Sequence, residues 1–365
     1  MPGKSLIVLC DGTWSDLGHA RRPPTNVAKL AQWIRPHGVG PCEHQPQIVH
    51  YVDGVGVSRE AVAGRIERFV GGAFGAGLIR NLECAYRFLV LNFSPGDSVF
   101  LFGFSRGAFT ARSLAGLINR VGILSPDQAD QIGAAISFYK SKRSTRWRKP
   151  VAIAYIGVWE TVGALGIPDM GLMPDAFGRR QHQFHDLNLS QSVRHARHAL
   201  ALNETRRAFS PTLWDNLGAL RDQTGGDYQQ RWFPGDHGSV GGGGEITGLS
   251  DGALSWIITG AHACGLGLDF KRMNLDADPM APLSNAVRAS KRRAGAKTVG
   301  RLSKGIMSAL PKHRRDFSAL NPSHLSDSAI ARWIKDEDFR SSIDRGGLKL
   351  STVRAALERQ GRITE

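Results

Sequence analysis

The chain of 365 residues has little cysteine, and its cysteines are not spaced to hold a metal ion or a disulfide framework. The four cysteines lie far apart in sequence, at Cys10, Cys42, Cys84 and Cys264. Structural zinc sites need closely spaced ligand pairs, and small secreted domains need many cysteines. We therefore expect reduced thiols and no bound metal.

Long hydrophobic runs are also missing. No stretch approaches 18 consecutive apolar residues, so we expect no transmembrane helix. The first apolar run, at residues 6–10, is too short for the core of a secretory signal and is typical of a strand. We therefore predict a cytoplasmic location in the producing cell, and any export would use a route that does not read an N-terminal signal.

Nucleotide-binding motifs are absent or incomplete. The sequence contains no G-x-x-x-x-G-K-[ST] loop, which excludes P-loop chemistry. The glycines at 71–77 match the dinucleotide pattern only in part, because no buried strand precedes them. We expect an activity that needs no cofactor.

Negative charge is scarce: 32 Asp and Glu residues stand against 47 Lys and Arg residues, which gives a net charge of +15. This balance favours anionic partners, such as nucleic acid, acidic membranes or phosphorylated substrates. The range 285–320, called the basic segment below, holds one acidic residue, Asp316, and ten basic ones: Arg288, Lys291, Arg292, Arg293, Lys297, Arg301, Lys304, Lys312, Arg314 and Arg315. Because it has few aromatic residues to stack on bases, we rank an anionic membrane above nucleic acid as its partner.

The remaining composition is that of a folded α/β protein. Hydrophobic residues make up 41% of the chain, which excludes a largely disordered chain. Apolar runs at 5–10, 98–102 and 151–156 are typical of strands that are buried on both faces of a parallel sheet. Helical spacing at 77–93 and 106–121 separates these runs, so we predict a mostly parallel sheet flanked by helices.

The domain boundaries follow from changes in composition. We assign 1–275 to an α/β domain and 276–365 to a basic, mainly helical extension, with helix-compatible stretches at 330–334 and 350–357. Residues 168–230 are rich in His, Arg, Gln and Asn and have few apolar runs. This range is therefore predicted to be an insertion or cap over a site.

The strongest local signal for chemistry is a nucleophile turn. Residues 103–107 match G-x-S-x-G directly after a predicted strand and directly before a predicted helix. In this arrangement a tight turn presents the serine at the carboxyl end of the sheet, and the flanking glycines avoid clashes. Ser105 is therefore the candidate nucleophile. A serine that only caps the following helix is the alternative, and it would need no partner base.

A serine nucleophile needs a general base, and His237 is the favoured candidate. It lies between the apolar residues 232–234 and four glycines at 241–244, and a glycine-rich loop can approach a site closely. A solvated loop histidine is the alternative. His195 and His198 fall in a helical pattern at 193–202, where a helix-surface role is favoured over metal binding.

Glu160 is the candidate acid of the triad. It follows the third strand run, at the sheet edge where Ser105 also lies and where catalytic groups of α/β sheets gather. Asp236 and Glu204 are held in reserve. Pairing of the Glu160 carboxylate with a helix N-terminus is the alternative role.

The end of the first strand offers an oxyanion hole. Gly12 allows close approach of the backbone, so we expect the N–H near Thr13 to act with the N–H of Arg106, the residue after the nucleophile. Asp11 lies at the same edge and could instead bind a cation together with Asp53 and Asp16.

Several segments occur in an order that resembles one family. They are Leu9-Cys10-Asp11-Gly12-Thr13-Trp14, Thr25-Asn26-Val27, Tyr51-Val52-Asp53-Gly54-Val55-Gly56, the serine motif with Ala108-Phe109, Gly157-Val158-Trp159, His198-Ala199-Leu200, and Trp232-Phe233-Pro234-Gly235 with His237 and Val240-Gly241-Gly242-Gly243. Over about 5–270 the chain resembles the bacterial α/β-hydrolase family, long labelled a domain of unknown function, that includes the first family of type VI secretion phospholipase effectors.

The resemblance implies a triad with Ser105 as nucleophile, Glu160 as acid and His237 as base, and it implies hydrolysis of phospholipid esters. A secretion apparatus and an immunity protein are therefore candidate partners. Three positions differ from the family pattern, since Glu160 replaces an aspartate and two further carboxylates, at 203 and 239, become Asn and Ser.

Two functions therefore remain open. The first is a serine esterase or lipase that cleaves carboxylic esters through an acyl-enzyme. The second is a catalytically weakened protein that binds an anionic membrane or nucleic acid through the basic segment. The serine motif favours the first, and the lost carboxylates and the charge of the basic segment favour the second.

Overall fold

The computed structural model describes residues 3–13, 15, 23–54, 73–141, 145–163, 188–206, 209–285, 315–318 and 320–362. Within these residues, six strands form one sheet in the order β2-β1-β3-β4-β5-β6. Every neighbouring pair of strands is parallel. The strands are β1 (Ser5–Cys10), β2 (Gln47–Val52), β3 (Ser98–Phe104), β4 (Tyr155–Trp159), β5 (Ala196–Ala201) and β6 (Tyr228–Phe233). The predicted α/β architecture with a parallel sheet is confirmed.

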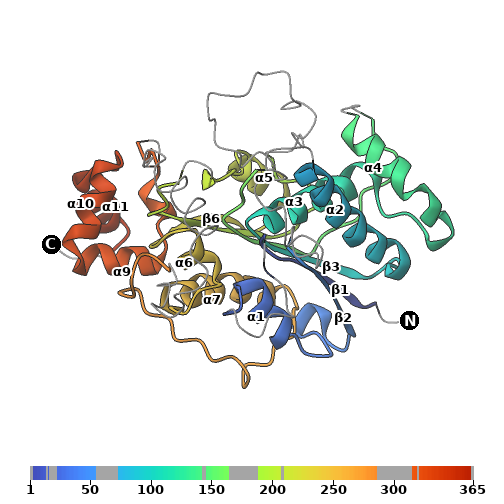
Figure 1. The fold of residues 1–365 in the computed structure, drawn as a ribbon, viewed down its shortest axis with the longest axis horizontal. Coiled ribbons are helices and arrows are strands. Elements are labelled where there is room, and N and C mark those ends of the chain that lie inside the picture. Colours follow the sequence, from blue (N-terminus) through green and yellow to red (C-terminus); the bar gives the residue numbers. More distant parts are fainter. Residues whose placement is uncertain are drawn as a thin grey trace, which may run out of the picture.

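Helices cover both faces of this sheet, as Figure 1 shows edge-on. One face carries α2 (Ala73–Asn92), α3 (Arg106–Val121), α4 (Ile132–Lys140) and α5 (Leu217–Thr224). The other face carries α1 (Asn26–Trp33), α6 (His237–Gly241) and α7 (Gly248–Ala263). Short 3-10 helices lie at η1 (Gly40–Cys42), η3 (Pro126–Gln131) and η5 (Pro322–His324).

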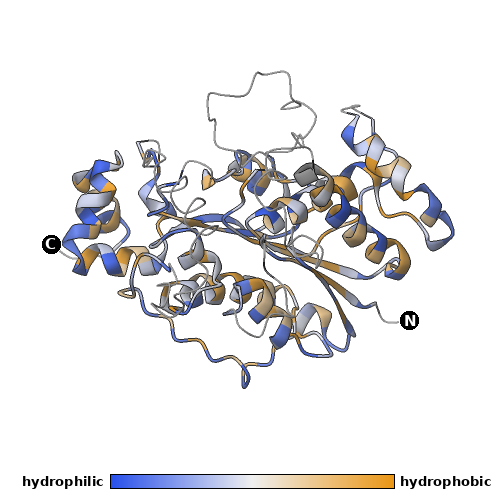
Figure 2. Ribbon diagram, viewed as in Figure 1, coloured by the Kyte–Doolittle hydropathy of each residue, from blue (hydrophilic) through white to orange (hydrophobic). Residues whose placement is uncertain are grey.

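The two-sided burial explains the consecutive apolar residues of the central strands. In β1, Leu6 and Val8 pack with α2 and α3, whereas Ile7 and Leu9 pack with α1 and α7, and all four are fully buried. The hydropathy colouring of Figure 2 shows the same mostly apolar strands between the two helical layers. The sequence ranges predicted for β1 and α3 are confirmed to the residue.

The sheet order reverses between β1 and β3, where the chain crosses from one half of the sheet to the other. In open α/β sheets, ligands bind at the carboxyl edge beside such a switch point. The chain leaves β1 at Asp11 and leaves β3 at Ser105, so both sequence candidates lie at this position.

The C-terminal helices α9 (Asp327–Lys335), α10 (Glu337–Arg345) and α11 (Leu350–Arg359) lie beyond the β6 edge of the sheet (Figure 1). Phe317, Phe339 and other apolar side chains of this region form one buried cluster with Leu200 and Leu202, at the end of β5, and Trp232 of β6. The N–H of Ser326 also donates to the carbonyl of Trp232. Residues of the predicted 276–365 extension thus pack directly on strands of the predicted 1–275 domain.

Two predictions about the sheet are wrong. Residues 168–230, predicted to be an insertion or cap, contain β5 and the start of β6, and 164–187 lie outside the described residues. The sequence pattern did not reveal β5 because this strand carries polar side chains, and their hydrogen-bond partners lie inside the fold. The third strand, predicted at 151–156, instead spans Tyr155–Trp159, and Glu160 directly follows it. A Cβ at Gly157 would lie 2.6 Å from Ile257, so glycine allows β4 to pack closely against α7. No helix in the described part of the chain is long and apolar enough to cross a membrane.

Candidate active site

A strained turn between β3 and α3 presents Ser105. This residue has φ 57° and ψ −118°, and its N–H donates to the carbonyl of Trp159 at 2.9 Å. A Cβ at Gly103 would lie 2.4 Å from the carbonyl oxygen of Gly107, and a Cβ at Gly107 would lie 2.1 Å from that of Cys10. Both glycines of the motif are therefore required by close backbone contacts.

The Ser105 side chain does not cap α3 but is directed to His237. Its hydroxyl lies 2.9 Å from Nε2 of His237, and Nδ1 of the same ring lies 3.0 Å from Oε2 of Glu160. All three residues are buried. The structure thus brings the three residues predicted as nucleophile, base and acid into one hydrogen-bonded chain.

The Glu160 carboxylate accepts four hydrogen bonds. Oε1 accepts from the N–H of Ala201 at 2.7 Å and from Nη1 of Arg315 at 3.0 Å. Oε2 accepts from His237 and from Nη2 of Arg315 at 2.9 Å. Burial alone would raise the pKa of Glu160, but the Arg315 charge and the hydrogen bonds from His237 and Arg315 outweigh it and lower the pKa to about 2.

An ionised Glu160 fixes the tautomer of the His237 ring. A carboxylate only accepts hydrogen bonds, so Nδ1 of His237 carries the proton and donates it to Glu160. Nε2 is then the free acceptor, and the Ser105 hydroxyl donates to it. The hydrogen bonds therefore leave Nε2 in the form that a general base requires.

His237 is the first residue of α6 rather than a loop residue, and its ring packs against two phenylalanine rings. The ring centroids of Phe104 and Phe209 lie 4.8 and 4.6 Å from that of His237. Oε2 of Glu204 accepts from the backbone N–H of His237 at 3.2 Å. The prediction that His237 lies in a loop is therefore wrong, because the residue begins a helix and is held by packing and a backbone hydrogen bond.

Neither reserve acid occupies the position beside the imidazole. Asp236 caps α6, accepting at Oδ1 from the N–H and hydroxyl of Ser239 at 2.9 Å each. Glu204 pairs with Arg206, whose Nη2 lies 2.6 Å from Oε2. Both carboxylates therefore support the backbone around His237.

The end of β1 lies against the nucleophile turn. A Cβ at Gly12 would be 2.8 Å from the ring of Phe104, and the buried hydroxyl of Thr13 has no hydrogen-bond partner among the described residues. Arg106, the first residue of α3, is desolvated, and this burial lowers its pKa to about 10. Gly12 therefore packs against Phe104, which directly precedes Ser105, and Arg106 directly follows Ser105.

The Asp11 carboxylate is satisfied by protein donors. It accepts from the Thr25 hydroxyl at 2.7 Å, the Tyr51 hydroxyl at 2.5 Å and the N–H of Gly12 at 2.6 Å. Burial raises its pKa to about 6 despite these bonds. Among the described residues, no three His, Cys, Asp or Glu side chains are grouped to hold a metal; Asp53 is exposed, and Asp16 lies outside the described part.

The prediction that His198 lies on a helix surface is wrong. It is fully buried in β5, and burial lowers its pKa to about 3, so the ring is neutral at pH 7. Nδ1 donates to Oε1 of Gln230 at 3.0 Å, while Nε2 accepts from the hydroxyl and N–H of Thr161. Thr161 directly follows Glu160, so its hydrogen bonds with the neutral His198 stabilise the turn that carries Glu160.

The basic segment behaves differently from its prediction at the one place where it can be examined. Residues 286–314, where the membrane contact is predicted, lie outside the described part of the chain. Arg315, one of the ten basic residues of this segment, is buried, and its guanidinium forms an ion pair with Glu160. Assigning Arg315 to a docking surface is therefore wrong.

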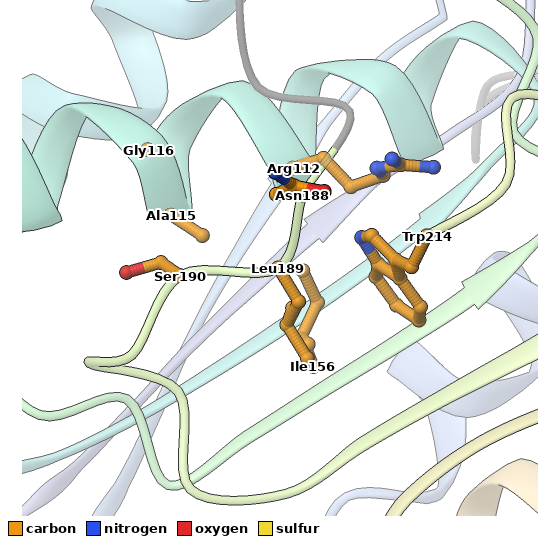
Figure 3. A pocket seen from close by; sticks show the side chains of 8 residues that line it. All are labelled: Arg112, Ala115, Gly116, Ile156, Asn188, Leu189, Ser190 and Trp214. Atoms are coloured by element: carbon orange, nitrogen blue, oxygen red, sulfur yellow. The ribbon is translucent and has the colours of Figure 1, made fainter. Parts of the chain in front are cut away.

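A small cavity of about 10 Å³ lies beside α3, separate from the triad (Figure 3). In Figure 3, the guanidinium of Arg112 lies next to the ring of Trp214, and these centres are 4.9 Å apart. The other lining residues are Ala115, Gly116, Ile156, Asn188, Leu189 and Ser190. A space of this size holds about one water molecule and is too small for an acyl chain.

Sequence reasoning missed Arg315, Phe104 and Phe209 as parts of the site. Phe104 could have been found, because it precedes the nucleophile within the serine motif. Phe209 lies in a polar stretch, and Arg315 lies in a run of cations, so neither carried a local signal.

Comparisons with known proteins agree with the geometry. A family model described as the catalytic domain of Tle1-like type VI secretion phospholipase effectors matches residues 4–260. The chain is also 30% identical over 236 residues to the uncharacterized protein YEL023C of Saccharomyces cerevisiae, an alignment that covers 57% of this chain and 32% of that protein. The chain therefore matches only about a third of the length of that relative.

Two solved structures show lower similarity. The Tle1 effector bound to the VgrG spike aligns with a TM-score of 0.38 and 16% identity, over 68% of this chain and 52% of that one. An uncharacterized protein from Pseudomonas aeruginosa aligns with a TM-score of 0.39 and 15% identity, over 98% of this chain and 62% of that one. The family match, which spans well over half of the chain, carries the assignment: this chain belongs to the Tle1-like family of type VI secretion phospholipase effectors and contains its catalytic domain.

Proposed function

We propose that this protein is a serine hydrolase that cleaves the carboxylic esters of lipids, with phospholipids as the substrate class. The observation that carries the proposal is the continuous chain from the Ser105 hydroxyl through His237 to Glu160. Family membership supports the lipid substrate.

The reaction proceeds through an acyl-enzyme. As Oγ of Ser105 attacks the ester carbonyl, Nε2 of His237 takes its proton, and Glu160 stabilises the imidazolium that forms. His237 then protonates the leaving alcohol, and a water molecule that His237 deprotonates cleaves the acyl–Ser105 bond. The fatty acid is released, and the proton returns to Ser105.

The developing oxyanion needs donors beside Ser105. We assign the backbone N–H of Arg106 and the N–H or hydroxyl of Thr13 to this role, because Arg106 directly follows Ser105 and Thr13 follows Gly12, which packs against Phe104. The buried Thr13 hydroxyl, unpartnered among the described residues, supports this assignment. Loss of one oxyanion donor typically costs about 3 kcal/mol of transition-state stabilisation.

The test is the hydrolysis of p-nitrophenyl butyrate and of phosphatidylglycerol vesicles, together with labelling by a fluorophosphonate probe. We expect Ser105→Ala to lower kcat by at least about 10⁴-fold and to abolish labelling. Ser113→Ala removes another buried serine, about two turns further along α3, and is expected to keep both signals. Equal rates for wild type and Ser105→Ala would reject the proposed function.

Export is a separate proposal that rests on family membership alone. We propose that the protein leaves its producer through a type VI secretion apparatus and that an immunity protein protects the producer. Secretion that persists after this apparatus is inactivated would contradict the proposal.

A further inference from the structure

Arg315 reaches the centre of the site from outside the matched catalytic region. It lies beyond residues 4–260, in the stretch that leads into the C-terminal helices. Its guanidinium forms a bidentate pair with the Glu160 carboxylate, with N–O distances of 3.0 and 2.9 Å. The two paired side chains are 7% and 0% exposed, so water screens this pair very little.

The ion pair with Arg315 compensates the negative charge of the buried Glu160 carboxylate. An unpaired carboxylate in a protein interior takes up a proton rather than remain charged. A protonated Glu160 would lose the negative charge that holds His237 in its Nδ1–H tautomer. Arg315 supplies the compensating charge and a planar fork that fixes both carboxylate oxygens.

Arg315 also links the acid to the loop that packs on the base. Nη2 donates to the carbonyl of Phe209 at 2.9 Å, and Nη1 donates to that of Ala201. The ring of Phe209 in turn lies against the imidazole of His237. One guanidinium therefore holds the carboxylate, the end of β5 and a wall of the histidine pocket.

We propose that Arg315 is a positioning residue of this active site, which keeps Glu160 ionised and aimed at His237. The inference rests on the proposed serine hydrolase function. It means that the chain beyond the matched catalytic domain completes the catalytic machinery.

The pH dependence of activity reports on this role. The titratable and charged groups that face the Glu160–His237 pair are Arg315, Arg206, His198 and Glu204. Of these, only Arg315 forms an ion pair with Glu160. Removing this cation raises the pKa of Glu160, and a protonated Glu160 no longer holds the Nδ1–H of His237, so the acid limb of kcat/KM moves to higher pH.

The experiment measures kcat, KM and the pH profile on p-nitrophenyl butyrate for Arg315→Met and Arg315→Lys in the full chain. We expect Arg315→Met to lower kcat by about tenfold to a hundredfold, to change KM by less than about twofold and to shift the acid limb upward. Arg315→Lys, which keeps the charge but loses the fork, is expected to give intermediate values.

Arg332→Met is the matched control. Arg332 is also a buried arginine of the C-terminal region, paired with Asp336 and donating to the carbonyls of Pro279 and Ala281. We expect this variant to lose stability but to keep the wild-type kcat per folded molecule and the wild-type acid limb.

A mutant cycle with Glu160→Gln separates positioning from folding. If Arg315 acts through the carboxylate, adding Arg315→Met to Glu160→Gln lowers kcat no further. The same fold-loss in both backgrounds would overturn the proposal, as would wild-type kcat and acid limb in Arg315→Met. If Arg315→Met does not fold, wild-type values for Arg315→Lys would overturn it.

The Ser105→Ala arm distinguishes this inference from the proposed function. Equal rates for wild type and Ser105→Ala reject the function and this inference together. Ser105-dependent hydrolysis that is unchanged in the Arg315 variants rejects this inference alone.

Discussion

Ser105 and Glu160 both adopt left-handed backbone conformations, with φ values of 57° and 46°. Such conformations cost a non-glycine residue roughly 1–3 kcal/mol and persist only where the surroundings enforce them. Here the N–H of Ser105 donates to the carbonyl of Trp159, and the N–H of Glu160 donates to the carbonyl of Ala199. The strain at both residues places a hydroxyl and a carboxylate on opposite sides of one imidazole.

The pKa of Glu160 predicts an acid-sensitive contribution to stability. Its pKa is about 2 in the folded protein against 4.5 as the reference, so the unfolded chain binds the proton more tightly. The contribution, roughly 3 kcal/mol, is present above pH 4.5 and is lost as the pH falls toward 2. Urea unfolding at a series of pH values checks this.

The matched variant for this measurement is Glu160→Gln with Arg315→Met, which removes both buried charges. We expect the wild type to lose about 3 kcal/mol more than this variant between pH 5 and 2. Parallel pH profiles of the free energy of unfolding would contradict the assigned pKa.

At the scale of elements, the site is assembled from strand ends and from the loop after β5. β3 delivers Ser105, β4 delivers Glu160, and α6 begins with His237. The loop after β5 supports the base twice, through Glu204 at its backbone and Phe209 at its ring. The orientation of the histidine thus depends on an element that carries none of the three triad residues.

Phe209→Ala tests this dependence. We expect kcat to fall by about tenfold, because small misplacements of a catalytic group are costly, while substrate binding changes little. Phe270→Ala removes a phenylalanine that is 56% exposed and meets His262 edge to face, and it should leave kcat unchanged. The measurement is steady-state kinetics of both variants on p-nitrophenyl butyrate. Equal kcat for the two variants would show that the ring of Phe209 is not needed.

At the scale of the molecule, the C-terminal helices are packed on the catalytic sheet. Phe339 is 1% exposed within the apolar cluster that includes Leu200, Trp232 and Phe317. Phe317, which lies two residues after Arg315 in the chain, meets Trp232 edge to face with ring centroids 5.4 Å apart. Docking of these helices therefore holds the arginine that pairs with Glu160.

Phe339→Ala is expected to lower the free energy of unfolding by about 3–5 kcal/mol through loss of buried apolar contacts. Because Arg315 depends on this docking, activity and helical circular dichroism should be lost at the same urea concentration. Leu350→Ala is the control, because Leu350 is 39% exposed. This variant should change neither the free energy of unfolding nor the urea concentration at which activity is lost. Helical signal lost well before activity would show that the site does not need the C-terminal helices.

The net charge of +15 predicts attraction to anionic lipid surfaces. We expect cosedimentation with phosphatidylglycerol vesicles that weakens steeply between low and physiological salt, and no binding to phosphatidylcholine vesicles. Binding that is equal for both lipids would contradict an electrostatic contact.

The sequence by itself determined the elements whose signals are local. The apolar run of β1, the helical spacing of α3 and the glycines around Ser105 identified the parallel sheet and the nucleophile turn, because they depend on neighbouring residues. β5 was missed because the polar side chain of His198 pairs with Gln230, on the next strand. Hydrophobic periodicity cannot reveal a polar residue whose partner is distant in sequence.

Only the tertiary structure decided what surrounds the triad. Arg315 stands 155 positions from Glu160, and in sequence it looks like every other cation of the basic segment. Packing of the C-terminal cluster brings its guanidinium to the carboxylate, and the low dielectric of the interior makes that pairing necessary. Local chemistry identified the reacting residues, whereas long-range packing determined the charge that holds them in place.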